Sequence, residues 1–261
     1  MFNYPYIVEL LSPKRSADPQ IESLLDRFAE RYRRIMAAGC GVSIPDNPMG
    51  QPRVGALEGL GLRDLAVDPE KVVMNLNTFH TKNELDALLH NGVKTRLKYI
   101  LVVRGDGGSL LSSLDPERIG GKMNVATSID LIRYINTEYP DRFVTGAAFN
   151  PYKPMPFELK RMGQKIDAGA KFVVTQPIIG RNDTVDELRH FEIPVVVEAW
   201  MSNNIDLLYK SVGQDKDARA EAYDPIENLK VLHDSYPDAC VYLSMLSFKP
   251  DWRQILPKLS A

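Results

Sequence analysis

Eight short apolar runs alternate with longer segments of helical periodicity along this chain. The runs are rich in Val, Ile, Phe and Tyr and are almost continuously apolar, which is typical of parallel strands covered by helices. They span residues 6–11, 41–44, 71–77, 97–103, 143–150, 171–176, 193–200 and 240–246. Eight βα units in roughly 250 residues match a closed (β/α)8 TIM barrel of the α/β class. We therefore predict one barrel domain over residues 1–261, with an open doubly wound sheet as the alternative.

The segments between these strands have the apolar spacing of amphipathic helices. Helices are expected over 19–38, 82–92, 128–139, 157–169, 184–191, 203–213 and 227–236. A charged helical insert is expected at 214–223, and a last helix is expected to begin at 251–256. The Gly/Pro-rich segment 45–53 and the segment from Arg104 to about Met123 are expected to be loops.

Composition excludes several classes of protein. Lys and Arg number 32 and Asp and Glu 34, with 44% hydrophobic residues, which argues against a disordered chain and against a strongly basic nucleic-acid binder. No apolar stretch approaches a membrane span, and the first residues lack the pattern of a signal peptide. Cys40 and Cys240 are too few for a disulfide scaffold or a metal site. We expect a cytoplasmic protein that binds neither membrane nor nucleic acid nor metal.

Polar residues occur at the end of nearly every predicted strand. In strand order they are Glu9, Ser43 and Asp46, Asn75 and Asn77, Arg104 and Asp106, Asn150, Thr175 and Gln176, Glu198, and Ser244 and Ser247. Chemistry in a barrel is built at the C-terminal ends of the strands, so these side chains are expected to converge on one ligand cavity.

Two carboxylates lie within apolar strands, where a lone negative charge is costly. Glu9 is expected either to form a buried ion pair or to be a carboxyl of raised pKa that acts as a general acid. Glu198 is either its partner in a polar network or a structural carboxylate. His80 follows the third strand and could approach a ligand, whereas His90, His190 and His233 are expected on solvated helix faces. Asp106 and Gln176 also have purely structural interpretations: Asp106 as a residue that forms a turn, and Gln176 as an amide that is hydrogen-bonded in the core.

Several catalytic motifs are absent. The sequence has no HExxH, CxxC or GxSxG motif, no P-loop and no GxGxxG between a strand and a helix. Metal-dependent hydrolysis, Ser-triad chemistry and nucleotide binding of the Rossmann type are therefore disfavoured.

The order of five motifs is more specific than any one of them. They are VELLSPKR (8–15), GVSIPDNP (41–48), LKYILVVRGDGG (97–108), TGAAFNP (145–151) and LKRMGQKIDAGAKFVVTQPI (159–178). This series resembles the methylenetetrahydrofolate reductase family, most strongly in KIDAGAKFVVTQ and in the RGD that ends the fourth strand. The resemblance is clear from the first to the sixth strand and weaker to the eighth, and the family fold is a (β/α)8 barrel.

The resemblance implies flavin-dependent reduction of 5,10-methylenetetrahydrofolate to 5-methyltetrahydrofolate, with NADH or NADPH as donor and FAD favoured over FMN. Glu9 matches the family's general acid, which protonates the folate so that its five-membered ring opens. Asp106 matches the aspartate beside flavin and pterin, and Gln176 a substrate contact. The implied cofactor contacts are Arg104, Gly105, Asp106, Asn75, Phe149 and Lys165.

The sequence also departs from the family pattern. Asn75 and Phe149 stand where many members have His and Tyr, and Pro45 and Asp46 replace a Thr–Tyr pair. These losses affect cofactor contacts more than Glu9, so flavin could be weakly held or replaced by direct hydride transfer from nicotinamide. The alternative function is a folate-binding barrel without redox activity, in one-carbon or methyl transfer or as a partner subunit.

A third alternative, an aldolase using Lys165, is least favoured because Lys165 falls in a predicted helix. The sequence is compatible with a homo-oligomer and with an electron-donating partner subunit.

Overall fold

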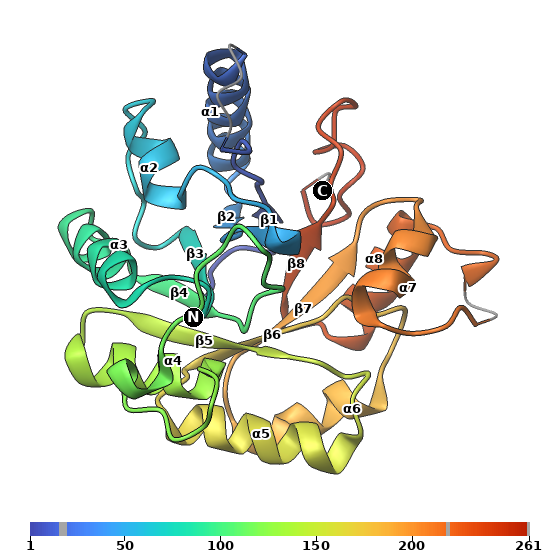
Figure 1. The fold of residues 1–261 in the computed structure, drawn as a ribbon. Helices are drawn as coiled ribbons and strands as arrows, with labels where there is room; N and C mark the ends of the chain where they lie inside the picture. Colours follow the sequence, from blue (N-terminus) through green and yellow to red (C-terminus); the bar gives the residue numbers. More distant parts are fainter. Residues whose placement is uncertain (16–19, 218–219, 260–261) are drawn as a thin grey trace.

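The computed structural model describes residues 1–15, 20–217 and 220–259, and its eight parallel strands close into a barrel in sequence order (Figure 1). The strands are β1 (Tyr6–Glu9), β2 (Gly41–Ile44), β3 (Val72–Leu76), β4 (Tyr99–Val102), β5 (Val144–Phe149), β6 (Phe172–Thr175), β7 (Val195–Trp200) and β8 (Cys240–Ser244). Since β8 also pairs with β1, the sheet has no open edge, which confirms the (β/α)8 prediction and excludes the open doubly wound sheet.

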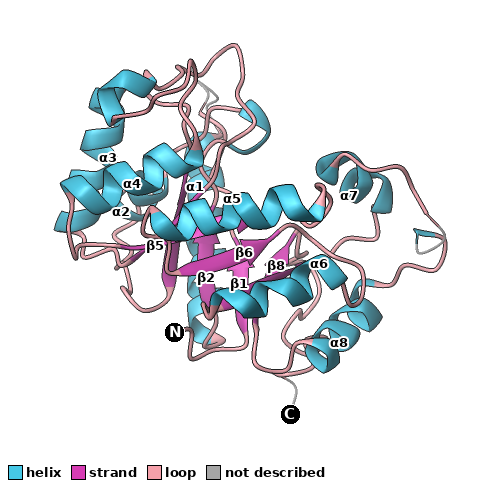
Figure 2. Ribbon diagram, turned by 90° about the horizontal axis from the view of Figure 1, so that it is seen from below, coloured by secondary structure: helices cyan, strands magenta, loops and turns pink. Residues whose placement is uncertain are grey.

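Helices surround the barrel (Figures 1 and 2). They are α1 (Ile21–Ala37), α2 (Ala56–Gly61), α3 (Lys82–Lys94), α4 (Ser128–Glu138), α5 (Met155–Asp167), α6 (Asp183–Asp186), α7 (Ile205–Val212) and α8 (Pro225–Ser235), with 3₁₀ turns η1 (Pro48–Gly50), η2 (Pro116–Ile119) and η3 (Glu187–Phe191). Local sequence fixes several starts: Thr81 and Glu84 form a capping box that begins α3, and Thr127 and Asp130 form one that begins α4. None of the described helices is long and apolar enough to span a membrane.

Side chains alternate between two apolar cores along each strand. Val8 and Val42 point outward and pack with Phe28 and Ile35 of α1 in the large core between barrel and helices. The inward side chains form a separate core inside the barrel, made of Ile7, Val73, Tyr99, Leu101, Phe172, Val174, Val196, Cys240 and Tyr242. The same alternation therefore assigns every further strand residue to the helix side or to the interior.

Three sequence predictions about elements were wrong. Residues 251–256 form turns rather than a helix, although Trp252 and Leu256 are fully buried. The short helix α2 lies between β2 and β3, where none was predicted. The described part of the 214–223 insert contains no α-helix, and its residues 218–219 lie outside the described residues.

Candidate active site

A polar layer closes the interior core at the C-terminal end of the barrel. In such a barrel, inward side chains of alternate strands share layers of four. The relevant register pairs are Glu9↔Ser43, Asn75↔Leu101, Ala148↔Val174 and Glu198↔Tyr242. Followed around the barrel, this register places Glu9, Asn75, Ala148 and Glu198 in one layer. This layer brings together three of the strand-end polar residues, Glu9, Asn75 and Glu198, and two of them are carboxyls.

The next layers down and up continue the same pattern. Below lie Ser43, Leu101, Val174 and Tyr242, and the layer above includes Val103, Gln176 and Ser244. Ser43 Oγ donates a hydrogen bond of 2.8 Å to Asn75 Oδ1, so the layers are joined through polar side chains. The transition from apolar to polar occurs where a barrel builds its binding site.

Two hydrogen-bond donors contact Glu9, and no described cation forms an ion pair with it. The Tyr242 hydroxyl lies 3.5 Å from Oε1, and the backbone N–H of Met245 donates to Oε2 over 3.3 Å. Burial raises the pKa of Glu9, while these two donors and the charge of Arg53 oppose the rise. The net direction is upward, which favours a protonated carboxyl.

Glu198 has a similar environment with one added cause. Its pKa is raised to about 8, first by burial and then by the negative charge of Glu9. A hydrogen bond with Ser244 opposes this rise. The backbone N–H of Glu198 donates to Thr175 Oγ1 over 3.0 Å, which ties β7 to β6 at this level. The two carboxyls are thus electrostatically coupled.

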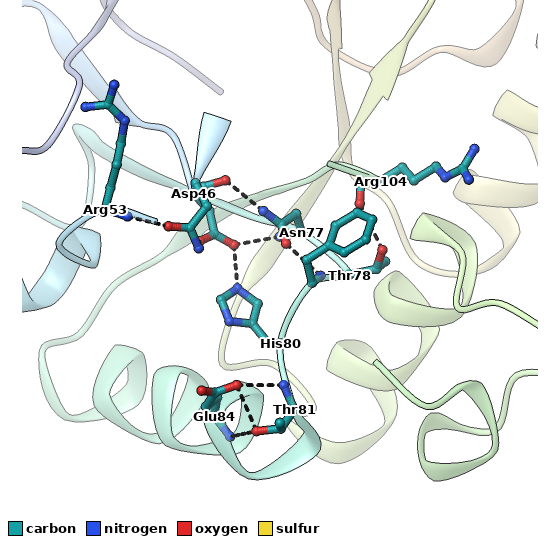
Figure 3. Close-up of polar contacts among 10 residues, drawn as sticks. Asp46, Arg53, Asn77, Thr78, His80, Thr81, Glu84 and Arg104 are labelled. Carbon is teal, nitrogen blue, oxygen red and sulfur yellow. Dashed lines mark hydrogen bonds and ion pairs between the residues drawn. The ribbon is translucent and has the colours of Figure 1, made fainter. Parts of the chain in front are cut away.

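A second polar cluster lies beside this layer, at the ends of β2 and β3 (Figure 3). His80 Nε2 is 2.6 Å from Asp46 Oδ2, and the same carboxylate oxygen accepts the backbone N–H of Asn77 over 3.0 Å. Asn77 Nδ2 donates back to the Asp46 carbonyl over 2.7 Å. Burial lowers the pKa of His80, but the hydrogen bond and charge of Asp46, together with the charge of Glu84, more than offset it, so the pKa is raised.

A cavity of about 500 Å³ borders the Asp46–His80 cluster and reaches Asn75 of the polar layer, but neither Glu9 nor Glu198 is among the residues that line it. It lies among the ends of β2 and β3, α2 and α3, and its polar lining includes Asn75, Asp46, His80 and Arg53. Arg53 also donates to the Ser12 carbonyl. A cavity of this size is within the usual range for small-molecule sites.

Two loops meet at this end of the barrel. Met49 N–H donates to Asp106 Oδ2 over 2.7 Å, joining the β2–α2 loop to the loop that follows β4. Gly50 and Gly107 both have positive φ, and a Cβ at Gly50 would lie 1.7 Å from the Gly107 carbonyl oxygen. Only glycine allows the loops to approach so closely. Asp106 is therefore fixed at the same end of the barrel as Glu9 and Gln176.

Some predicted contacts face elsewhere. Phe149 is 0% exposed and packs in the helix-side core, because Ala148 is the inward residue of β5. Lys165 of α5 is buried behind β5, with Nζ 2.5 Å from the Ala148 carbonyl and 3.4 Å from Glu158 Oε1. Arg104 is exposed, and its guanidinium points away from the Asp46–His80 cluster (Figure 3). Phe149 and Lys165 do not line the cavity, and neither do Arg104, Asp106 and Gln176.

One prediction about histidines was wrong, and two site residues were missed. His233 is 8% exposed rather than solvated, and its Nε2 lies 2.7 Å from the Tyr6 hydroxyl. Tyr242 was not singled out, although alternation with Ser244 in the last strand could have placed it inward. Arg53 lies in a loop, where sequence offers no periodic signal. Among the described residues, no three His, Cys, Asp or Glu side chains are arranged to hold a metal ion.

A family model matches most of this chain, and two relatives match a smaller part of it. Residues 15–199 match the family model described as Methylenetetrahydrofolate reductase. Methylenetetrahydrofolate reductase 1 of Schizosaccharomyces pombe is 32% identical over 109 residues, 40% of this chain and 17% of that protein. Methylenetetrahydrofolate reductase 2 of Saccharomyces cerevisiae is 33% identical over 99 residues, 35% of this chain and 16% of that protein. The match thus spans about a sixth of the length of these relatives.

Solved structures share the fold at low sequence identity. The 7,8-dihydropteroate synthase from Vibrio fischeri aligns with a TM-score of 0.50 and 11% identity, over 93% of this chain and 88% of that one. A dihydropteroate synthetase solved with a product has a TM-score of 0.50 and 14% identity, over 93% and 89%. These similarities support the barrel fold alone.

Proposed function

The chain belongs to the methylenetetrahydrofolate reductase family, and on that premise we propose that it interconverts 5,10-methylenetetrahydrofolate and 5-methyltetrahydrofolate by hydride transfer. The hydride comes from a reduced nicotinamide, and Glu9 is the general acid. The observation that carries this proposal is the half-buried Glu9 carboxyl, which lies in a polar layer at the C-terminal end of the barrel with its pKa raised.

The chemistry requires a proton before the hydride. Glu9 gives its proton to a folate nitrogen, the C–N bond of the five-membered ring breaks, and an electrophilic iminium is left on the methylene carbon. Hydride addition to that carbon gives the methyl group. A carboxyl can be such an acid near neutral pH only if it keeps its proton there, and burial favours this.

Asp106 and Gln176 are proposed to orient the pterin. Asp106 is held by Met49 at the same end of the barrel as Glu9, and Gln176 lies one layer above Glu9. Carboxylate and amide groups can pair with the ring nitrogens and exocyclic amine of a pterin. The cavity lined by Asn75 and Arg53 offers space for the parts of the folate and the nicotinamide that extend beyond the pterin.

The residues present fit a flavin only in part. Asn75, Gly105 and Asp106 lie near the barrel mouth, but Phe149 and Lys165 are buried on the helix side, and Lys165 is held by Ala148 and Glu158. The contact set that the family resemblance implies is therefore not assembled. This arrangement favours direct hydride transfer from nicotinamide to the folate, for which a flavin is not needed.

The test is an assay of the purified full chain with 5,10-methylenetetrahydrofolate and NADH or NADPH, each with and without added FAD or FMN. We expect oxidation of the nicotinamide that depends on folate, 5-methyltetrahydrofolate as product, and no flavin absorbance in the purified protein. Stimulation only by a flavin would restore the flavin-dependent mechanism. Folate binding without turnover for any donor would favour the non-redox folate-binding barrel.

A further inference from the structure

We propose that Glu198 is a positioning residue for Glu9: the two carboxyls share a proton within one layer of the barrel, so that Glu9 stays able to donate it near neutral pH. This inference rests on the proposed function of Glu9 as an acid. It assigns a role to a carboxylate that the family motifs do not cover.

The strand register places the two carboxyls in the same layer. Glu9 and Glu198 are inward residues of β1 and β7, which flank β8, and the register puts them in the same layer. Tyr242 of β8 lies one layer below and between them, with its hydroxyl 3.5 Å from Glu9. Both carboxyls influence the Tyr242 hydroxyl, whose pKa is raised well above its ordinary value by burial first and then by their charges.

The charges around the pair do not stabilise two carboxylates. Among the residues that the structure describes, the titratable groups that face the pair are Tyr242 from β8 and Arg53 from the β2–α2 loop, and Arg53 acts on Glu9. Ser43, Asn75 and Ser244 complete the surroundings and are uncharged. Within the described ranges, no cation forms an ion pair with Glu198. Two like charges in such a site cannot both ionise easily, so the pair retains one proton.

A purely structural carboxylate would be placed differently. A buried charge is normally kept with a partner cation because its desolvation is costly, and breaking such a pair leaves the charge uncompensated. Glu198 has instead a second carboxyl as its electrostatic partner. This arrangement is the one that holds a proton at neutral pH, since each carboxylate disfavours ionisation of the other.

The pair of carboxyls can supply one proton and recover it in each turnover. When the shared proton lies on Glu9, the Glu9 O–H bond breaks and an N–H bond forms on the folate. Before this step, the negative charge on Glu198 disfavours loss of the Glu9 proton to solvent. The pair is left with two carboxylates and takes up one proton from solvent before the next turnover. An acid of pKa close to the working pH is the most effective one.

The first test is the pH profile of kcat/KM for the wild type and Glu198→Gln. In the wild type, activity on the alkaline side should be lost with the last proton of the pair. Gln has nearly the same shape but no charge, so in the variant the loss should occur at lower pH. A shift of one pH unit means about a tenfold lower kcat/KM on the alkaline side of the profile, with little change in kcat/KM at acidic pH.

Glu187→Gln is the matched control, because Glu187 lies in η3 and forms an ion pair with the exposed His190. Its profile should follow the wild type, and Glu198→Asp, which keeps a carboxyl, should restore the alkaline limb. An unshifted limb in Glu198→Gln would overturn the proposal.

A second measurement does not depend on turnover. Infrared titration of the wild-type chain with isotope-labelled glutamate should show a protonated carboxyl band that persists above pH 7 and disappears at lower pH in Glu9→Gln. If the chain reduces no folate, the proposed function fails while this band still reports the pair. Absence of such a band above pH 7 would overturn the pair even in an active enzyme, and even if Glu198→Gln did not fold.

Discussion

His80 Nε2 lies 2.6 Å from Asp46 Oδ2, and this contact joins the end of β2 to the segment that enters α3. Both side chains are largely buried, with 11% and 14% of their surface exposed. The contact therefore lies on the wall of the cavity and also contributes to the fold. Its dependence on protonation gives a specific prediction for stability.

Replacement of His80 by Gln should destabilise the fold most at mildly acidic pH. The folded pKa of His80 is raised by Asp46, so its contribution is fully present below the unfolded value of 6.5. That contribution is lost as pH rises through the folded pKa. We expect His80→Gln to lower the free energy of unfolding by about 1.5–3 kcal/mol at pH 6 and by less in alkali.

Urea unfolding at several pH values measures this effect. His90→Gln is the control, since His90 is an exposed residue of α3. An equal loss at acidic and alkaline pH would contradict a charged His80–Asp46 pair.

Gly50→Ala tests the contact between the two loops. A Cβ at Gly50 would meet the Gly107 carbonyl, and the backbone has φ +65°. Gly39→Ala is a matched control, because Gly39 has φ +73° but nothing within 4 Å of its added Cβ. Both variants should lose about 1 kcal/mol from backbone strain, and Gly50→Ala should lose further stability from the clash.

Because Met49 holds Asp106, Gly50→Ala should also raise the KM for folate, whereas Gly39→Ala should not. Thermal unfolding and steady-state kinetics of the two variants provide the measurement. If the two variants behave alike, the loop contact has no role in placing Asp106.

His233 should make the fold sensitive to acid. Its pKa is lowered to about 4, by burial first and then by Lys258, so the folded state keeps it neutral. The contribution to stability is present above the unfolded value of 6.5 and is lost as pH falls from there through 4. We expect a loss on the order of 1–3 kcal/mol from this group between pH 7 and 4.

In His233→Gln, that part of the pH dependence should disappear, as judged by denaturant unfolding at pH 4 to 7. His190→Gln, at an exposed position in η3, should retain the wild-type dependence. The same slope in His233→Gln and the wild type would contradict the assignment.

The fold was predictable because the barrel repeats one signal eight times. Each strand is an apolar run and each helix has its own apolar spacing, so errors in single elements did not alter the architecture. The failed helix at 251–256 has apolar Trp252, Ile255 and Leu256 at helical spacing, but Pro250 and Pro257 limit its length. The missed α2 is six residues long with glycines, and its burial of Leu57 and Leu60 depends on tertiary packing.

The candidate site was predictable only as far as strand ends. Alternation places Glu9 and Glu198 inward, but their shared layer follows from the register of all eight strands, which no local pattern contains. In β5, both Ala148 and Phe149 are apolar, so the sequence does not indicate which of the two side chains points outward. His233 could have been found, because it lies four residues after the buried Leu229 on α8.

The central claim is that Glu9 is the acid of the reaction, and Glu9→Gln tests it most directly. The amide keeps the shape of the side chain but has no proton to give, so kcat for folate reduction should fall by about 10²- to 10⁴-fold. The dissociation constant for folate, measured by calorimetry on the same variant, should stay close to that of the wild type. A kcat within about tenfold of the wild type would contradict the acid role of Glu9.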